Sequence, residues 1–173
     1  MNHYCLECGT QLDTRIIEDR KREICPACGW IHYKQYKVSA GVRIEKDGRL
    51  LLVKRGIDPW KGHWYMPAGF LEVDEDPEEA AVREAFEETG LKVKTLRLAG
   101  VYTYKDDPRG NGIVFLYDAE ILGGTMQITN ETEKIGFLSA EEVMQLKFTG
   151  ISGFNQIQDW LKTKGVLMEI DHA

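Results

Sequence analysis

The chain has 173 residues, of which 43% are hydrophobic and 29% charged, and its formal net charge at pH 7 is −6. These values are ordinary for a globular protein, and the length predicts one main domain with a small appendage. The apolar runs are shorter than the roughly 20 residues that cross a bilayer, and no secretory signal opens the sequence. We therefore expect a cytoplasmic protein without a membrane partner. The mild acidity argues against a broad nucleic-acid-binding surface.

All four cysteines lie near the start of the chain, in two Cys-x-x-Cys pairs: Cys5 and Cys8, then Cys25 and Cys28. A glycine follows each pair, and glycine permits the turn in which backbone N–H groups face the thiolates. Two such turns predict a closed tetrahedral site that binds a structural Zn²⁺ through four thiolates. Two disulfides are the alternative, which the lack of an export signal disfavours.

Residues 1–34 are therefore expected to form a small zinc ribbon of short hairpins. Its charged middle runs from Thr14 to Glu23, where bases and acids are balanced, so no basic and aromatic stripe stands out. A ribbon of this size can bind nucleic acid, another protein or its own neighbour. We favour packing or dimerisation, and expect a homodimer.

Residues 35–173 carry strand signals interspersed with helix signals, which predict an α/β domain with a mixed sheet between helices. A turn at Lys46–Gly48 joins the first two strands. Ser139 resembles the start of a capped helix, and residues 151–164 are periodic enough for a final amphipathic helix. The expected strands are residues 38–44, 49–55, 93–101, 113–121 and 135–138.

The segment from Gly69 to Leu91 holds nine acidic residues and one base, a local charge of −8 against −6 for the whole chain. Asp76 and Glu79 fit a capping box at the start of a helix, and Gly90 fits a left-handed stop. The helix is expected to pack on the core through one arc, formed by Ala81, Val82, Ala85, Phe86 and Thr89.

Glu84, Glu87 and Glu88 are spaced so that they stand on one ridge of this helix, beside the packing arc. A solvated surface face is the ordinary outcome for such a helix. The alternative is a site for a hard divalent cation, which takes oxygen ligands.

The full spacing resembles the signature of the Nudix hydrolases: Gly69, five residues, Glu75, seven residues, Arg83-Glu84, Ala85, one residue, Glu87-Glu88, one residue, Gly90-Leu91. The soft departure is Ala85, where the family often has a larger aliphatic residue. The resemblance implies the Nudix fold, an α/β/α sandwich with a mixed sheet, preceded here by the four-cysteine ribbon.

The resemblance also implies hydrolysis of a pyrophosphate bond in a nucleoside diphosphate that is joined to another group. Mg²⁺ or Mn²⁺ would be held by Glu84, Glu87 and Glu88 with the Gly69 carbonyl. Glu88 is the first choice for a metal-bridging or general-base role. Glu75 is expected to bind Arg83 and so fix the ridge.

The base can also come from a later loop in this family. Glu133 stands where many members carry an extra carboxylate, and Glu131 is the near competitor. Solvated loop glutamates are the ordinary alternative.

Further residues are candidates for substrate contacts. Arg43, Arg55 and Arg109 could bind phosphates. Several aromatic residues could stack on a base, although most aromatics in such positions are core: Trp64 and Tyr102, and also Trp60, Tyr65, Phe70 and Tyr104.

A zinc ribbon ahead of a Nudix domain is similar to two groups. The NADH pyrophosphatases carry a further motif after the Nudix signature. The matching region here, Leu98–Tyr104, lacks that motif. The plant plastid FAD/ADP-ribose pyrophosphatase and its bacterial relatives are similar over nearly the whole length. We therefore expect an ADP-linked substrate, ADP-ribose or FAD ahead of NADH. The alternatives are a housecleaning or RNA 5′-end hydrolase, and a non-catalytic regulator, which the intact carboxylate set disfavours.

Overall fold

The computed structural model describes residues 3–167, and the chain divides into two units between Gln35 and Tyr36. This division lies one residue after the boundary expected from the sequence. Residues 1–2 of the expected ribbon and 168–173 of the expected second domain lie outside the described residues. Within the described part, no helix is long and apolar enough to cross a bilayer.

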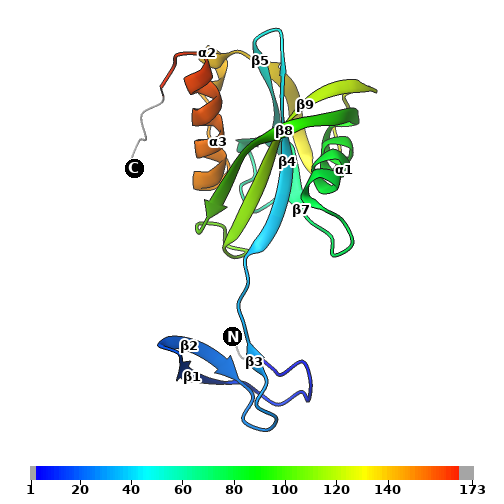
Figure 1. Cartoon of the computed structure of the whole chain (residues 1–173). Helices are drawn as coiled ribbons and strands as arrows, with labels where there is room; N and C mark the ends of the chain where they lie inside the picture. Colours follow the sequence, from blue (N-terminus) through cyan, green and yellow to red (C-terminus); the bar gives the residue numbers. More distant parts are fainter. Residues whose placement is uncertain (1–2, 168–173) are drawn as a thin grey trace. The chain divides into compact units, whose positions relative to one another are not determined.

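The first unit is a small antiparallel sheet with the strand order β1-β2-β3. Glu18 and Asp19 join the first two strands and have positive φ angles of 51° and 60°, as in a tight two-residue hairpin turn. The strands are β1 (Asp13–Ile17), β2 (Arg20–Ile24) and β3 (Ile31–His32) (Figure 1).

The second unit is built on a seven-stranded sheet with the central order β10-β5-β4-β9-β8, in which β6 pairs with β5 and β7 with β4. β4 and β9 are parallel, and the other pairs are antiparallel, so the sheet is mixed as predicted. The strands are β4 (Lys37–Lys46), β5 (Arg49–Arg55), β6 (Trp64–Tyr65), β7 (Ala68–Phe70), β8 (Leu91–Tyr104), β9 (Gly112–Gly124) and β10 (Thr132–Leu138).

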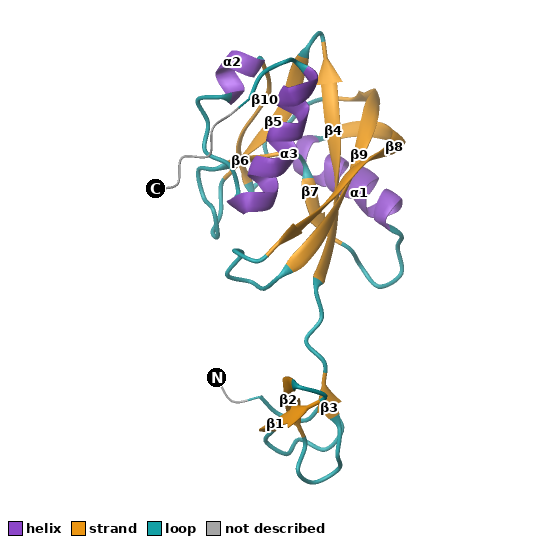
Figure 2. Ribbon diagram, turned by 60° about the vertical axis from the view of Figure 1, so that its left-hand side comes forward, coloured by secondary structure: helices purple, strands orange, loops and turns teal. Residues whose placement is uncertain are grey.

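Helices cover both faces of this sheet, which makes the expected α/β/α sandwich (Figure 2). They are α1 (Pro77–Thr89), the short α2 (Ala140–Val143) and α3 (Gly150–Thr163). Successive residues of β5 serve the two sides, because Leu51 packs in the cluster that contains α1, whereas Leu50 and Leu52 pack with α3. This is the side-chain alternation that a strand imposes.

The start and the end of α1 follow the sequence prediction. The Asp76 side chain accepts from the N–H groups of Glu78 and Glu79, and the Glu79 side chain accepts from the Asp76 N–H, which completes the capping box. Gly90 ends the helix with φ 74°, and the left-handed region suits glycine because it has no Cβ.

The packing arc of α1 is turned relative to the prediction, and the expectation for Phe86 is wrong. Ala81 and Ala85 are fully buried, as expected. Phe86 is 48% exposed, whereas Glu88, which was not expected on the packing arc, is buried. Small side chains on the buried face let the helix lie close to β4, which leaves room for a large ring only at the flank. The turned arc points Glu88 toward the β6–β7 segment.

β8 and β9 are each longer than predicted, since they pair with one another from Leu91 against Gly124 to Tyr104 against Gly112. Three register shifts interrupt this pairing. Such bulges disturb the alternation of apolar and polar residues from which strands are recognised. The added length carries Tyr104 to the wall of the cavity described below.

Candidate active site and cysteine site

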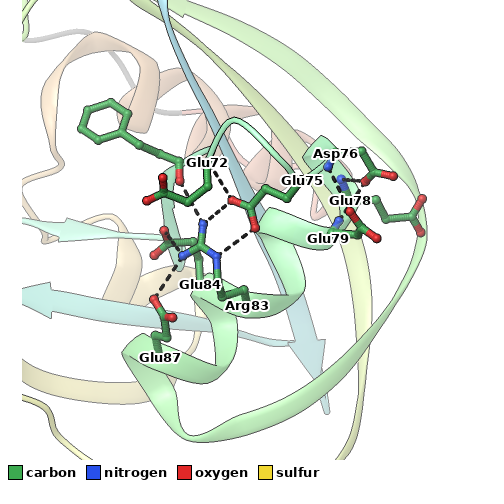
Figure 3. Close-up of polar contacts among 9 residues, drawn as sticks. Glu72, Glu75, Asp76, Glu78, Glu79, Arg83, Glu84 and Glu87 are labelled. Carbon is green, nitrogen blue, oxygen red and sulfur yellow. Dashed lines mark hydrogen bonds and ion pairs between the residues drawn. The ribbon is translucent and has the colours of Figure 1, made fainter.

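Arg83 binds several acceptors in the acidic segment Gly69–Leu91. Its Nη2 and Nε donate to the two carboxylate oxygens of Glu75 at 2.5 and 2.9 Å, as the sequence predicted (Figure 3). Nη2 also donates to the Phe70 carbonyl at 3.0 Å, and Nη1 donates to Glu84 at 2.7 Å. A planar guanidinium suits this many acceptors. Arg83 therefore ties α1 to the strand β7 and to the loop that follows it.

The paired hydrogen bonds from Arg83, called the Arg83–Glu75 fork below, also change the pKa of Glu75. The hydrogen bonds from Arg83, helped by the Glu72 N–H, lower the pKa of the Glu75 carboxyl to about 2. Glu75 is thus ionised at neutral pH, and both of its carboxylate oxygens are occupied by Arg83.

Glu88 is buried, with 7% of its surface exposed. The Tyr65 hydroxyl donates to its Oε1 at 2.6 Å, and the Ala68 N–H donates to its Oε2 at 3.0 Å. Burial raises the pKa of Glu88 to about 8, and the neighbouring Glu84 charge adds to the shift, whereas the Tyr65 hydrogen bond opposes it. A buried carboxyl in this state gains from a cation, which would favour the ionised form.

Glu84 lies directly against Gly69. A Cβ at position 69 would overlap the Glu84 carboxylate, so only glycine leaves space for it there. Burial raises the pKa of Glu84, which the Arg83 hydrogen bond partly offsets. The glycine that opens the acidic segment is therefore needed to seat a carboxylate, as a metal cradle would require.

The three carboxylates of α1 do not form one compact set. Glu87 is exposed and accepts from Arg83 Nη1 at 3.1 Å, and Glu84 accepts from the same nitrogen at 2.7 Å. Among residues 3–167, the oxygens of Glu84, Glu87 and Glu88 do not all lie within 4.8 Å of one another. The donors are all oxygen, which suits Mg²⁺ or Mn²⁺. The side chains would have to move closer together to hold one ion.

A cavity of about 520 Å³ opens over these groups. This volume falls within the usual range for small-molecule sites. Glu84, Glu87 and Glu88 line it together with Gly69 and Arg83. The rest of the wall includes β7, the ends of β5 and β8, the β6 segment, the loops near residues 60, 106 and 130, and the first half of α3.

Two of the expected phosphate-binding residues, Arg55 and Arg109, lie on the cavity wall. Arg55 Nε donates to the Pro59 carbonyl at 2.7 Å, and its guanidinium lies 5.9 Å from the centre of the Tyr65 ring. Arg109 is held by Asp107 at 2.7 Å and lies 5.1 Å from the centre of the Phe70 ring. Both cations are therefore fixed in place at the site.

Three other expected substrate contacts lie away from the cavity. Arg43 donates to Asp118 at 2.6 Å beside a different, shallow pocket. Trp64 is buried in the core beside α3. Tyr102 packs against the same core and donates to Asp159 at 3.0 Å. The structure does not bring these three residues to the acidic cluster.

The two loop glutamates are separated by the structure. Glu131 lines the cavity. Glu133 is not on that wall, and its Oε1 accepts from Lys54 Nζ at 2.6 Å. The geometry therefore favours Glu131, the competitor, over Glu133 as a further carboxylate at this site.

A family model described as the NUDIX domain matches residues 18–159. This chain belongs to the Nudix family. The resemblance read from the Gly69–Leu91 spacing is thereby confirmed, and the acidic helix of the structure is the Nudix helix.

Two solved structures are similar to this Nudix chain. A Nudix hydrolase from Nitrosomonas europaea has a TM-score of 0.80 at 28% identity and covers 95% of this chain and 94% of that one. The Nudix domain of NrtR from Shewanella oneidensis, complexed with ADP ribose, has a TM-score of 0.62 over 76% of this chain and 90% of that one. Its 20% identity supports the fold alone.

Two curated relatives match this chain over part of their own length. An ADP-ribose pyrophosphatase of Methanocaldococcus jannaschii is 41% identical over 106 residues, which is 61% of this chain and 63% of the relative. The NAD-capped RNA hydrolase NudC of Chromobacterium violaceum is 32% identical over 126 residues, 73% of this chain and 45% of the relative. The matches thus span less than two thirds of these relatives.

Sequence reasoning missed the role of Tyr65, which it treated as one of several rings that could stack on a base. It also missed Gln156, which lines the cavity from α3. Gln156 and Ser152 are both buried polar residues. Their spacing of four places them on the buried face of an amphipathic helix, and that signal could have found Gln156.

The four cysteines of the first unit come together as the sequence predicted. Their Sγ atoms lie 3.5 Å (Cys8–Cys25), 3.6 Å (Cys5–Cys28) and 3.7 Å (Cys8–Cys28) apart, and no disulfide joins them. A tetrahedral Zn²⁺ with Zn–S bonds of 2.3 Å places its sulfurs about 3.8 Å apart. The quartet therefore fits zinc, and the disulfide alternative does not hold.

Proposed function

We propose that this Nudix protein hydrolyses the pyrophosphate bond of an ADP-linked compound, with ADP-ribose or FAD preferred over NADH. The products would be AMP and a phosphorylated partner, ribose 5-phosphate or FMN. The observation that carries this proposal is a cavity whose wall holds the carboxylates of Glu84, Glu87 and Glu88 together with two fixed arginines. Acids suit divalent cations, arginines suit phosphates, and a diphosphate needs both.

Mg²⁺ or Mn²⁺ is the proposed cofactor, because such an ion activates water and neutralises charge on phosphoryl oxygens. Glu84, Glu87, Glu88 and the Gly69 carbonyl would hold it. The Arg83–Glu75 fork keeps the helix that carries these glutamates in register with β7.

The other groups of the cavity act on the substrate. Arg55 and Arg109 would bind the diphosphate, and their contacts with Pro59 and Asp107 hold them in place before it arrives. A carboxylate oxygen of Glu88 would accept the proton of the attacking water. Glu131 is the second candidate for this proton.

The choice of an ADP-linked substrate rests on the relatives and on the motif. The ADP-ribose pyrophosphatase of M. jannaschii supports ADP-ribose. The relatives named NAD-capped RNA hydrolase favour a second candidate, the NAD-type cap of RNA. The sequence Leu98–Tyr104 lacks the motif expected for NADH pyrophosphatases. We therefore place an NAD-type substrate, including the RNA cap, after ADP-ribose and FAD.

We also propose a structural Zn²⁺ on the cysteine quartet and a homodimer in solution. A closed four-thiolate site leaves no open position for substrate, so this zinc would stabilise the ribbon and take no part in hydrolysis. Sedimentation of the purified protein tests the dimer.

A substrate panel with Mg²⁺ tests the proposed function. ADP-ribose, FAD, NADH, deoxynucleoside triphosphates and NAD-capped RNA would be incubated with the protein, and the products separated by chromatography. We expect AMP from ADP-ribose or FAD at the highest kcat/KM. The highest kcat/KM for NAD-capped RNA would favour the second candidate, and no hydrolysis of any compound would favour a non-catalytic regulator.

A further inference from the structure

Three side chains of the ribbon, which the proposed function does not use, converge outside the cysteine quartet. The His3 Nδ1 lies 2.7 Å from Glu23 Oε1, and the His32 Nδ1 lies 2.7 Å from Glu23 Oε2. Among residues 3–167, this triad is the group besides the cysteines whose ligand atoms gather within 4.8 Å of one another.

The backbone fixes all three positions. Glu23 and His32 are direct partners across β2 and β3, so their side chains share one face of the small sheet. The His3 carbonyl accepts from the Leu12 N–H at 2.9 Å, which anchors the segment before the first cysteine. The Trp30 ring stacks on His32 at 5.8 Å with an interplanar angle of 8°, and His3 meets His32 edge to face.

The triad is open to ions, because the side chains of His3, Glu23 and His32 are 40%, 20% and 35% exposed. Glu23 has no arginine or lysine within ion-pair distance in the described chain; both of its recorded ion pairs are with the histidines. At hydrogen-bond distance, its carboxylate oxygens are therefore held by the two imidazoles.

We propose that His3, Glu23 and His32 form a second metal site in this protein, which binds Zn²⁺ or a similar borderline transition metal. Two imidazoles and one carboxylate are a zinc ligand set that leaves a fourth position for water. Imidazole nitrogen excludes Mg²⁺ as the preferred ion.

The present distances describe the hydrogen-bonded form of the triad, in which imidazole Nδ1–H groups donate to Glu23. Ligands of a tetrahedral zinc stand about 3.3 Å apart, given bonds of 2.0–2.1 Å. The two nitrogen–oxygen distances would thus lengthen by about 0.6 Å, and each imidazole would carry its proton on Nε2. Their partial exposure allows both changes without disturbing the strands.

The test measures bound zinc on the full-length protein after dialysis against Zn²⁺ with excess Mg²⁺, which occupies the oxygen-only site. We expect about two zinc ions per chain, one on the thiolates and one on the triad. Glu23→Gln and His3→Asn should each bind about one. Asp13→Asn, which changes another carboxylate of the same ribbon, is the matched control and should bind about two.

The intensity of thiolate-to-cobalt charge transfer after Co²⁺ substitution reports whether the cysteine quartet is intact in each variant. About one zinc in the wild type, with this band intact, would overturn the proposal. Retention of both ions in Glu23→Gln would overturn it as well. Loss of the band in both triad variants would assign the triad to ribbon folding instead.

Discussion

Glu88 is a buried carboxyl, and both of its oxygens already accept hydrogen bonds. Tyr65 supplies one of the two donors from β6, a strand of two residues. The sequence identified Glu88 by its place in the Nudix spacing. It could not identify Tyr65, because the two residues are 23 positions apart and meet only after α1 has packed against β6 and β7.

The first prediction concerns this contact. Tyr65→Phe removes the hydroxyl and leaves Glu88 free to rotate, so we expect the affinity for Mn²⁺ and kcat/KM each to fall by about 10- to 100-fold, as is typical when a residue that orients a metal ligand is lost. Calorimetry and steady-state kinetics measure the two quantities.

Tyr102→Phe is the matched control, because it removes a hydroxyl that donates to Asp159 outside the cavity. It should leave both quantities near the wild-type values. Equal losses in the two variants, or none in Tyr65→Phe, would contradict the positioning role of Tyr65.

The second prediction concerns stability and pH. Burial raises the pKa of Glu88 from its usual 4.5 to about 8 in the folded protein. A raised carboxyl pKa contributes stability fully below the unfolded value and loses it as the pH rises through the folded value. Without divalent cations, the free energy of unfolding should therefore decline from pH 4.5 toward pH 8, by at most about 1.4 kcal/mol per pH unit from this group.

Glu88→Gln has no charge to bury and should lack this decline, which denaturant titrations across the pH range would show. Glu120→Gln changes an exposed glutamate of β9 and should follow the wild type. The account of Glu88 fails if wild type and Glu88→Gln run parallel.

At the scale of elements, most of the second unit could be predicted because its signals are local. The capping box of α1 and its glycine stop are contacts between residues at most four apart, and they agree with the structure. The packing arc was predicted less well, since it depends on which neighbour the helix meets. Phe86 fits the apolar period of an isolated helix, but the fully buried residues of α1 in the core cluster are the small Ala80, Ala81 and Ala85.

Placement of side chains at the cavity depends on tertiary contacts and was predicted least well. Arg43 and Arg109 are both arginines near expected strand ends or loops. The first is neutralised by Asp118 on β9, and the second by Asp107 at the cavity wall. The Asp107 partner of Arg109 is 2 residues away in the sequence, whereas the Asp118 partner of Arg43 is 75 residues away and is brought to it only by the fold.

The third prediction concerns the start of α1. Asp76→Ala removes the acceptor for the N–H groups of Glu78 and Glu79, so the free energy of unfolding of the Nudix unit should fall by about 1 kcal/mol. Denaturant unfolding measures it. Asp74→Ala, an exposed aspartate of the same loop, should change stability far less, and a larger effect there than at Asp76 would contradict the capping assignment.

At the scale of the whole molecule, the chain joins a ribbon with little apolar core to a domain with a two-sided core. The buried apolar residues of the two large clusters all belong to the second unit. The ribbon therefore needs another source of stability, and a four-thiolate metal site supplies one.

The fourth prediction follows from this division. Cys8→Ser should lose the thiolate-bound zinc and the fold of the ribbon, while the Nudix unit keeps its own unfolding transition and most of its kcat. Metal analysis, calorimetric unfolding and kinetics on the same preparation measure these effects. Complete loss of hydrolysis with an unchanged Nudix transition would contradict a purely structural zinc.

The central claim is that the acidic helix serves divalent cations, and Mn²⁺ binding followed by electron paramagnetic resonance tests it most directly. With ADP-ribose present, the wild-type protein should remove free Mn²⁺ from solution, and Glu84→Gln, which changes the carboxylate seated on Gly69, should bind far less. Absence of Mn²⁺ uptake by the wild type, with and without the nucleotide, would contradict the account.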